Sequence, residues 1–203
     1  MNCRIKIAVL AALALSAERA FAADPRYPDW PCSQAKVPEI SLAAVWAGPP
    51  LDDVSDKWKN DARINALVTK LAARRMPLDE AEKTITDFLG ASADKTMAGK
   101  LLFAGLFDTL NAQRFQVMNG LERVTRKQRE SADKIRADTI ALQDLQSAAA
   151  PDQQKVDELS NTLLWETRIF EDRRRVVKFV CEVSTAIDQR LFALGRVIQQ
   201  DIE

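Results

Sequence analysis

Residues 151–203 read PDQQKVDELSNTLLWETRIFEDRRRVVKFVCEVSTAIDQRLFALGRVIQQDIE, and this stretch decides the fold. Its apolar residues recur at alternating steps of three and four, which is the spacing of a heptad repeat. The apolar positions of the series are Val156, Leu159, Leu163, Phe170, Val177, Val180, Ile187, Leu191, Leu194 and Ile198. Polar residues complete it at Glu166, Arg173 and Ser184. Such a seam predicts a long helix paired with another helix.

A matching series lies upstream, in residues 94–149. Its apolar positions are Phe107, Leu110, Val117, Leu121, Val124, Ile135, Leu142 and Leu145, and its other positions are Arg114, Gln128, Ser131 and Asp138. Pro151 ends this helix, and Asp152 can cap the next one. The short connection predicts antiparallel neighbours that turn near residues 150–152, with facing residue numbers that add to about 300.

The start of the upstream helix, residues 101–107, is apolar around much of its circumference and needs more than one partner. Residues 51–90 supply candidates, because their periodicity predicts helices over 53–75 and 79–89, with Gly90 as a C-terminal cap. We therefore expect an all-α fold. A long antiparallel two-helix coiled-coil hairpin (91–203) would carry a small helical bundle at its base.

Residues 23–50 are rich in proline and aromatic side chains, which predicts an extended arm with a short helix over 41–47. Residues 1–22 have the features of a secretory signal peptide: a basic start, an apolar run over 7–15 and the small-x-small sequence at 20–22. The cleavage site stays open. We expect a periplasmic or secreted protein with no transmembrane segment after cleavage.

Cysteine use agrees with export. Cys3 lies in the signal, so Cys32 and Cys181 remain as an even pair. In an oxidising compartment such a pair predicts a disulfide. Two buried free thiols, or pairing with another chain, are the alternatives.

The composition points away from catalysis. There is no histidine, which removes the usual general base and the commonest transition-metal ligand. We therefore expect no enzyme, no cofactor and no metal site. Loss of Arg4, Lys6 and Arg19, against Glu18 alone, would lower the net charge from +0 to about −2. This balance argues against nucleic-acid binding.

Two features of the hairpin are candidate sites. Trp165 and Phe179 are fourteen residues apart and share a face that points away from the seam. Large exposed aromatic residues mark protein interfaces, so this face is a candidate docking site for a partner. Alternatively, an arm tethered at Cys181 would cover both side chains.

The second feature is a layer of polar residues in the seam. Its members are Gln128, Ser131, Asp138, Glu166 and Arg173. Such a layer could sense a ligand or act as a hinge, but polar seam residues also serve simply to fix the register of two helices.

These features favour an exported, non-enzymatic scaffold or adaptor that docks a partner protein through its hairpin. The partner could belong to an envelope complex, or the chain could associate with itself. Two alternatives stay open. One is a small-molecule or lipid-binding module with a pocket between Trp58, Phe103, Phe107 and Phe192, and the other is a periplasmic holdase chaperone.

Overall fold

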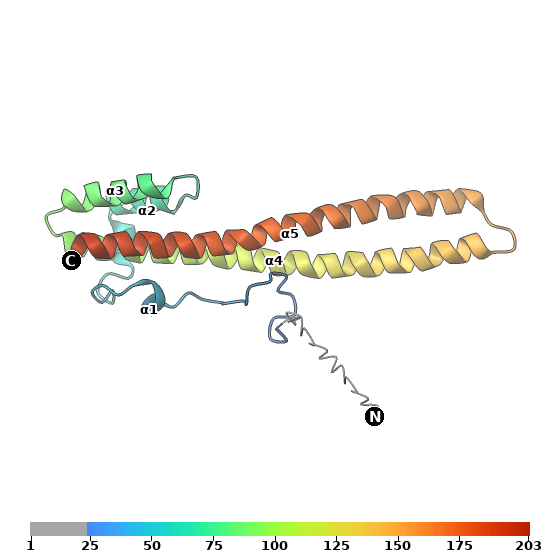
Figure 1. Ribbon diagram of the computed structural model, residues 1–203, viewed down its shortest axis with the longest axis horizontal. Coiled ribbons are helices and arrows are strands. Elements are labelled where there is room, and N and C mark those ends of the chain that lie inside the picture. Colours follow the sequence, from blue (N-terminus) through green and yellow to red (C-terminus); the bar gives the residue numbers. More distant parts are fainter. Residues whose placement is uncertain (1–23) are drawn as a thin grey trace, which may run out of the picture.

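The computed structural model describes residues 24–203, so the expected signal peptide lies outside the described residues. All regular secondary structure in this range is helical. Two long helices, α4 (Lys95–Ser147) and α5 (Gln153–Ile202), lie side by side and antiparallel (Figure 1). The predicted all-α fold with a long helical hairpin is therefore confirmed.

Aspartates begin both long helices. The Asp94 carboxylate accepts a hydrogen bond from the Met97 amide over 2.9 Å, and Asp152 accepts one from the Lys155 amide over 3.3 Å. Each bond satisfies an amide that has no partner within its own helix. Residues 148–152, which include Pro151, form the connection, so α4 ends two residues earlier than expected.

The facing pairs of the hairpin follow the predicted register. Arg114 Nε donates to Asp188 Oδ1 over 2.6 Å near the base, and Lys134 Nζ lies 2.6 Å from Glu166 Oε1 in the middle of the hairpin. In both pairs the residue numbers add to about 300, as expected for helices joined by a tight turn near Pro151.

The heptad seam of α5 is the packed face of that helix. Every position of the series from Val156 to Ile198 is buried or half-buried except Arg173, which is exposed. In α4 the corresponding exception is Val124. Two helices of about 50 residues, each roughly 75 Å long, are thus held together by a line of packed side chains that is interrupted only at these two positions.

The core of the protein lies at the base of the hairpin. Helices α2 (Ala62–Ala72) and α3 (Leu78–Gly90) pack there on one side of α4 and α5. The largest fully buried side chains are Val54, Leu71, Ile85, Leu89, Leu102, Phe103, Leu106, Leu110, Ile187, Leu191, Leu194 and Ile198. This packing confirms the small bundle expected at the base.

The helix expected over 53–75 is shorter than predicted. Helix α2 begins at Ala62, because the Asp61 side chain accepts hydrogen bonds from the amides of Arg63 and Ile64 and caps the helix there. Trp58 lies before this cap in a short 3-10 helix, η1 (Lys57–Asn60). Its Nε1 donates to Asp108 on α4 over 3.0 Å, so a tertiary contact takes the place of helical continuation.

Gly90 is not the C-terminal cap that the sequence predicts. It is the last residue of α3, and no glycine within the described residues has positive φ. The helix instead closes at Ala91, whose amide donates to the carbonyl of Asp87 over 3.2 Å. A right-handed final turn needs no glycine.

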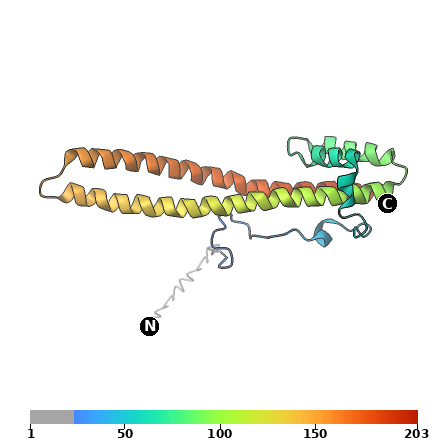
Figure 2. The same ribbon diagram turned by 180° about the vertical axis from the view of Figure 1, so that it is seen from behind.

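The proline-rich arm runs on the opposite side of the hairpin from α2 and α3 (Figures 1 and 2). Its one helix, α1 (Leu42–Val45), is shorter than the stretch 41–47 that we predicted. Immediately after it, the Trp46 ring stacks on Phe103 of α4 with ring centroids 4.2 Å apart. The arm is therefore packed against the core.

Candidate functional site

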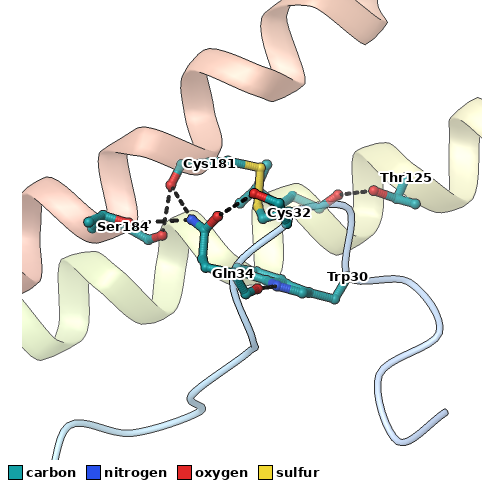
Figure 3. The surroundings of a disulfide bond; sticks show 9 residues. Trp30, Cys32, Gln34, Thr125, Cys181 and Ser184 are labelled. Carbon is teal, nitrogen blue, oxygen red and sulfur yellow. Dashed lines mark hydrogen bonds between the residues drawn. A yellow bond between two sulfur atoms is a disulfide. The ribbon is translucent and has the colours of Figure 1, made fainter. Parts of the chain in front are cut away.

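A disulfide joins the arm to the hairpin. Cys32 and Cys181 are bonded, with their Cα atoms 5.6 Å apart, as predicted (Figure 3). Beside the bond, Gln34 Nε2 donates to the Cys181 carbonyl over 3.1 Å, and Trp30 Nε1 donates to the Gln34 carbonyl over 2.7 Å. A disulfide is compatible with an oxidising compartment.

Beyond the disulfide, ion pairs direct the arm onto α4. The two carboxylate oxygens of Asp29 accept hydrogen bonds from Arg126 over 3.0 Å and from Arg129 over 2.6 Å. On the other side of Cys32, Lys36 pairs with Glu122 over 2.5 Å. Residues 24–36 therefore contact α5 around Cys181 and contact α4 between Glu122 and Arg129.

Trp165 and Phe179 are not covered by the arm, contrary to one of the two expectations. Each side chain is 65% exposed. The physical reason is that Asp29, three residues before Cys32, pairs with two arginines on α4, so the segment before the disulfide runs to α4 and not along α5. Both aromatic residues therefore remain on the open surface of the hairpin.

Further residues of α5 join these two aromatics in one line: the exposed Ile169 and Val176, the charged Asp172, and the half-buried Val183. We call this line the outer stripe, and its members are Trp165, Ile169, Asp172, Val176, Phe179 and Val183. They alternate by four and three residues, which makes a second heptad series on α5 beside the buried one. Sequence reasoning missed Ile169 and Val176, although the same spacing that reveals the seam also reveals them.

A groove runs between the outer stripe and α4. We call it the stalk groove, because it lies in the stalk, the two-helix part of the hairpin between the base bundle and the turn at residues 148–152. Seven apolar residues line its floor: Val117, Gly120, Leu121, Val124, Val176, Val177 and Val180. It has a volume of about 680 Å³, and its charged rim is formed by Arg123, Lys127, Asp172 and Arg173.

The rim of the stalk groove has an excess of positive charge. Asp172, its one acidic member, is already paired with Arg175 on the next turn of α5. Within residues 24–203, Arg123, Lys127 and Arg173 have no ion-pair partner. The groove thus combines an apolar floor with three cations free to meet an anionic group.

The structure brings only part of the predicted polar layer together. Gln128 Nε2 donates across the hairpin to the Phe170 carbonyl over 2.9 Å. Ser131 instead donates to the Lys127 carbonyl of its own helix, and Arg173 is exposed on the groove rim. Ser131, Glu166 and Arg173 nevertheless line one small pocket together with Lys134, so three of the five predicted members lie around a common space.

Lys134, which sequence reasoning left out, connects two members of the layer. Its Nζ lies 2.7 Å from Asp138 Oδ2 and 2.6 Å from Glu166 Oε1. Hydrogen bonds to Asp138 and then to Glu166 raise the pKa of the Lys134 ammonium. A lysine that bridges carboxylates of both helices ties α4 to α5 at a fixed register, which is the structural role considered for this layer.

The residues proposed for a small-molecule pocket do not surround a common space. Phe103 is fully buried under Trp46, whereas Phe192 lies half-exposed on the surface of α5. The stalk groove, by contrast, is an open space lined by seven apolar residues.

Among the described residues, no group of three or more possible metal ligands is found, and none of the helices in that range is long and apolar enough to cross a bilayer. Comparison with models of protein families, with curated proteins and with solved structures finds no match to this chain. The candidate site is thus defined by the geometry of the hairpin itself.

Proposed function

We propose that this protein is an exported, non-enzymatic scaffold or adaptor of the periplasm that docks a partner protein through its helical hairpin. The observation that supports the proposal is the exposure of Trp165 and Phe179 on one face of a packed, disulfide-anchored hairpin. Aromatic residues contribute most to protein interfaces when a rigid element presents them, because little side-chain entropy is lost on binding. The base bundle anchors the hairpin, and the stalk presents the docking face.

The test is affinity capture from envelope extracts with the tagged, disulfide-bonded protein. The double variant Trp165→Ala/Phe179→Ala should lose a defined partner that the unaltered chain retains. Leu164→Ala is the matched control, because Leu164 neighbours Trp165 and is 70% exposed but lines a different surface together with Arg168 and Arg175. This control should retain the partner.

The result also separates docking from a holdase activity. If the purified protein suppresses aggregation of unrelated unfolded proteins, and all three alanine substitutions weaken that effect equally, a chaperone is the better description. Capture that the double variant does not change would contradict the proposed docking face.

A further inference from the structure

The outer stripe does not end with the stalk. Steps of seven residues continue it along α5 through Ile169, Val176, Val183, Arg190 and Val197. Residues at such steps share one face of a supercoiled helix. Arg190 is buried and Val197 packs against the core, whereas Val176 is 58% exposed. This face of α5 is therefore covered by other parts of the protein in the base, at Arg190 and Val197, and is exposed to solvent in the stalk, at Val176.

Helix α3 provides much of the cover in the base. Thr86 on α3 donates to Asp201 Oδ2 over 2.8 Å, and Arg190 Nη1 donates to the carbonyl of Met76, just before α3, over 2.9 Å. These two contacts place α3 parallel to α5, with its first turn near Arg190. From that point toward the hairpin turn, no described segment lies over this side of α5 (Figures 1 and 2).

Helix α3 also shows what kind of helix fits this face. Three fully buried residues, Ala81, Ile85 and Leu89, form its packed face at steps of four. The acidic residues of α3 are Asp79, Glu80, Glu82 and Asp87, against the single base Lys83. The protein thus covers the base portion of this face with an acidic amphipathic helix of its own.

We infer that the stalk groove and the outer stripe receive an acidic amphipathic helix of a partner protein, seated on α5 in line with α3. This inference rests on the proposed docking function and names the chemistry of the partner. The bare stretch from Trp165 to Phe179 spans roughly 21 Å, which about 15 helical residues would cover. Acidic side chains flanking the apolar face of that helix would meet the unpaired Arg123, Lys127 and Arg173.

A second copy of this chain fits the groove less well. A two-fold symmetric contact would place the same surface on both sides of the interface. It would therefore set the positively charged rim of one copy against the positively charged rim of the other. Like charges held together in an interface oppose association, whereas an acidic helix removes the conflict.

The first experiment measures binding of two synthetic probes to the disulfide-bonded chain. Both are fluorescein-labelled helical peptides of about 20 residues, long enough to hold a helix, with Ala, Ile and Leu spaced as in α3. Glutamates flank the apolar face of the acidic peptide, and lysines replace them in the basic peptide. By fluorescence anisotropy, the acidic peptide should bind at least about tenfold more tightly.

Substitutions in the chain locate the binding site. Val176→Glu should weaken the acidic peptide by at least about tenfold, because it places a charge in the centre of the apolar floor. Leu164→Glu is the matched control on the other surface and should leave the affinity unchanged. The triple variant Arg123→Glu/Lys127→Glu/Arg173→Glu should reverse the preference toward the basic peptide. Circular dichroism confirms that each variant remains helical.

The outcomes distinguish this inference from the proposed function. Equal binding of both peptides, or binding that Val176→Glu leaves intact, would overturn the inference. The inference would also be overturned if the chain dimerises and Val176→Glu abolishes the dimer, because a second copy would then occupy the groove. A partner that is captured only when Trp165 and Phe179 are present, together with equal peptide affinities, would leave the docking function standing without an acidic helix.

Discussion

Arg190 on α5 donates a hydrogen bond from Nε to the carbonyl oxygen of Leu71 over 2.7 Å, at the C-terminal end of α2. Its side chain is buried and forms no ion pair within residues 24–203. The partial negative charge at a helix C-terminus takes the place of a carboxylate partner. A single guanidinium thus joins the small helices to the hairpin.

Arg190→Met should destabilise the protein by about 2–4 kcal/mol, since it removes hydrogen bonds from a charged donor and leaves buried carbonyl oxygens unpaired. Urea denaturation followed by circular dichroism measures the effect. Arg196→Met is the control on the same helix, because Arg196 is exposed. Equal stability of the two variants would show that the contacts to α2 contribute nothing.

Two glycines of α4 should respond in opposite directions to alanine. A Cβ atom on Gly105 would lie 2.6 Å from Val68 Cγ2 and 2.9 Å from Trp58 Cδ2, so Gly105→Ala should destabilise the fold by about 1–3 kcal/mol. A Cβ atom on Gly120 meets nothing within 4 Å. Gly120→Ala should therefore stabilise the helix by up to about 1 kcal/mol, through its higher helix propensity.

Thermal unfolding of these two variants beside the unaltered protein measures both changes. The pair controls for the substitution itself, because both exchange glycine for alanine within one helix. Changes of the same sign would contradict the packing of α2 and η1 against α4 around Gly105.

Loss of the disulfide should release the arm and leave the hairpin helical. The variant Cys32→Ser/Cys181→Ser should lose about 3–5 kcal/mol, because the bond constrains a very long loop of the unfolded chain. Trypsin should then cleave the arm faster at Arg26 and Lys36. The unaltered protein reduced with dithiothreitol is the control and should match the variant. An unchanged cleavage rate would mean that the ion pairs to α4 hold the arm alone.

Acid should weaken the contact between Asp53 and Lys100. Lys100 Nζ lies 2.5 Å from Asp53 Oδ1, and this hydrogen bond lowers the pKa of the Asp53 carboxyl. A lowered pKa in the folded state gives stability that is present above the ordinary value of about 3.9 and is lost as the pH falls through the lowered value.

Asp53→Asn should therefore reduce stability at pH 7, and the difference from the unaltered protein should shrink below about pH 4. Urea denaturation at a series of pH values measures it. Asp52→Asn is the matched control, because Asp52 is exposed and makes no ion pair among the described residues. A difference that stays constant down to pH 2 would contradict the assignment.

The hairpin could be predicted from the sequence because its cause is local and repeated. The seam residues from Val156 to Ile198 follow one another at the same alternating steps of three and four. Pro151 cannot lie in the interior of a regular helix, so it separates this helix from the one before it. The Cys32–Cys181 pairing was also predictable, since the third cysteine, Cys3, falls in the expected signal peptide and these two form the remaining pair. These features need no knowledge of distant contacts.

The boundaries at the base and the course of the arm depend on distant partners. Trp58 fits a helical periodicity, but its hydrogen bond to Asp108 and the cap at Asp61 fix it in a different local structure. Likewise, nothing in the sequence around Asp29 indicates that it will pair with Arg126 and Arg129, which lie about 100 positions further along the chain. The sequence therefore left two outcomes open for Trp165 and Phe179, exposure or cover by the arm, and the structure shows them exposed.

The bond between Cys32 and Cys181 joins residues 149 positions apart, so most of the chain forms one covalent ring. The hairpin turn at residues 148–152 lies within that ring, at the end farthest from the base (Figure 1). A protease that nicks the exposed turn once would leave both pieces in a single molecule, with the paired helices and the core still in place. We therefore expect the protein to tolerate a single cleavage in the hairpin turn as long as the disulfide is intact.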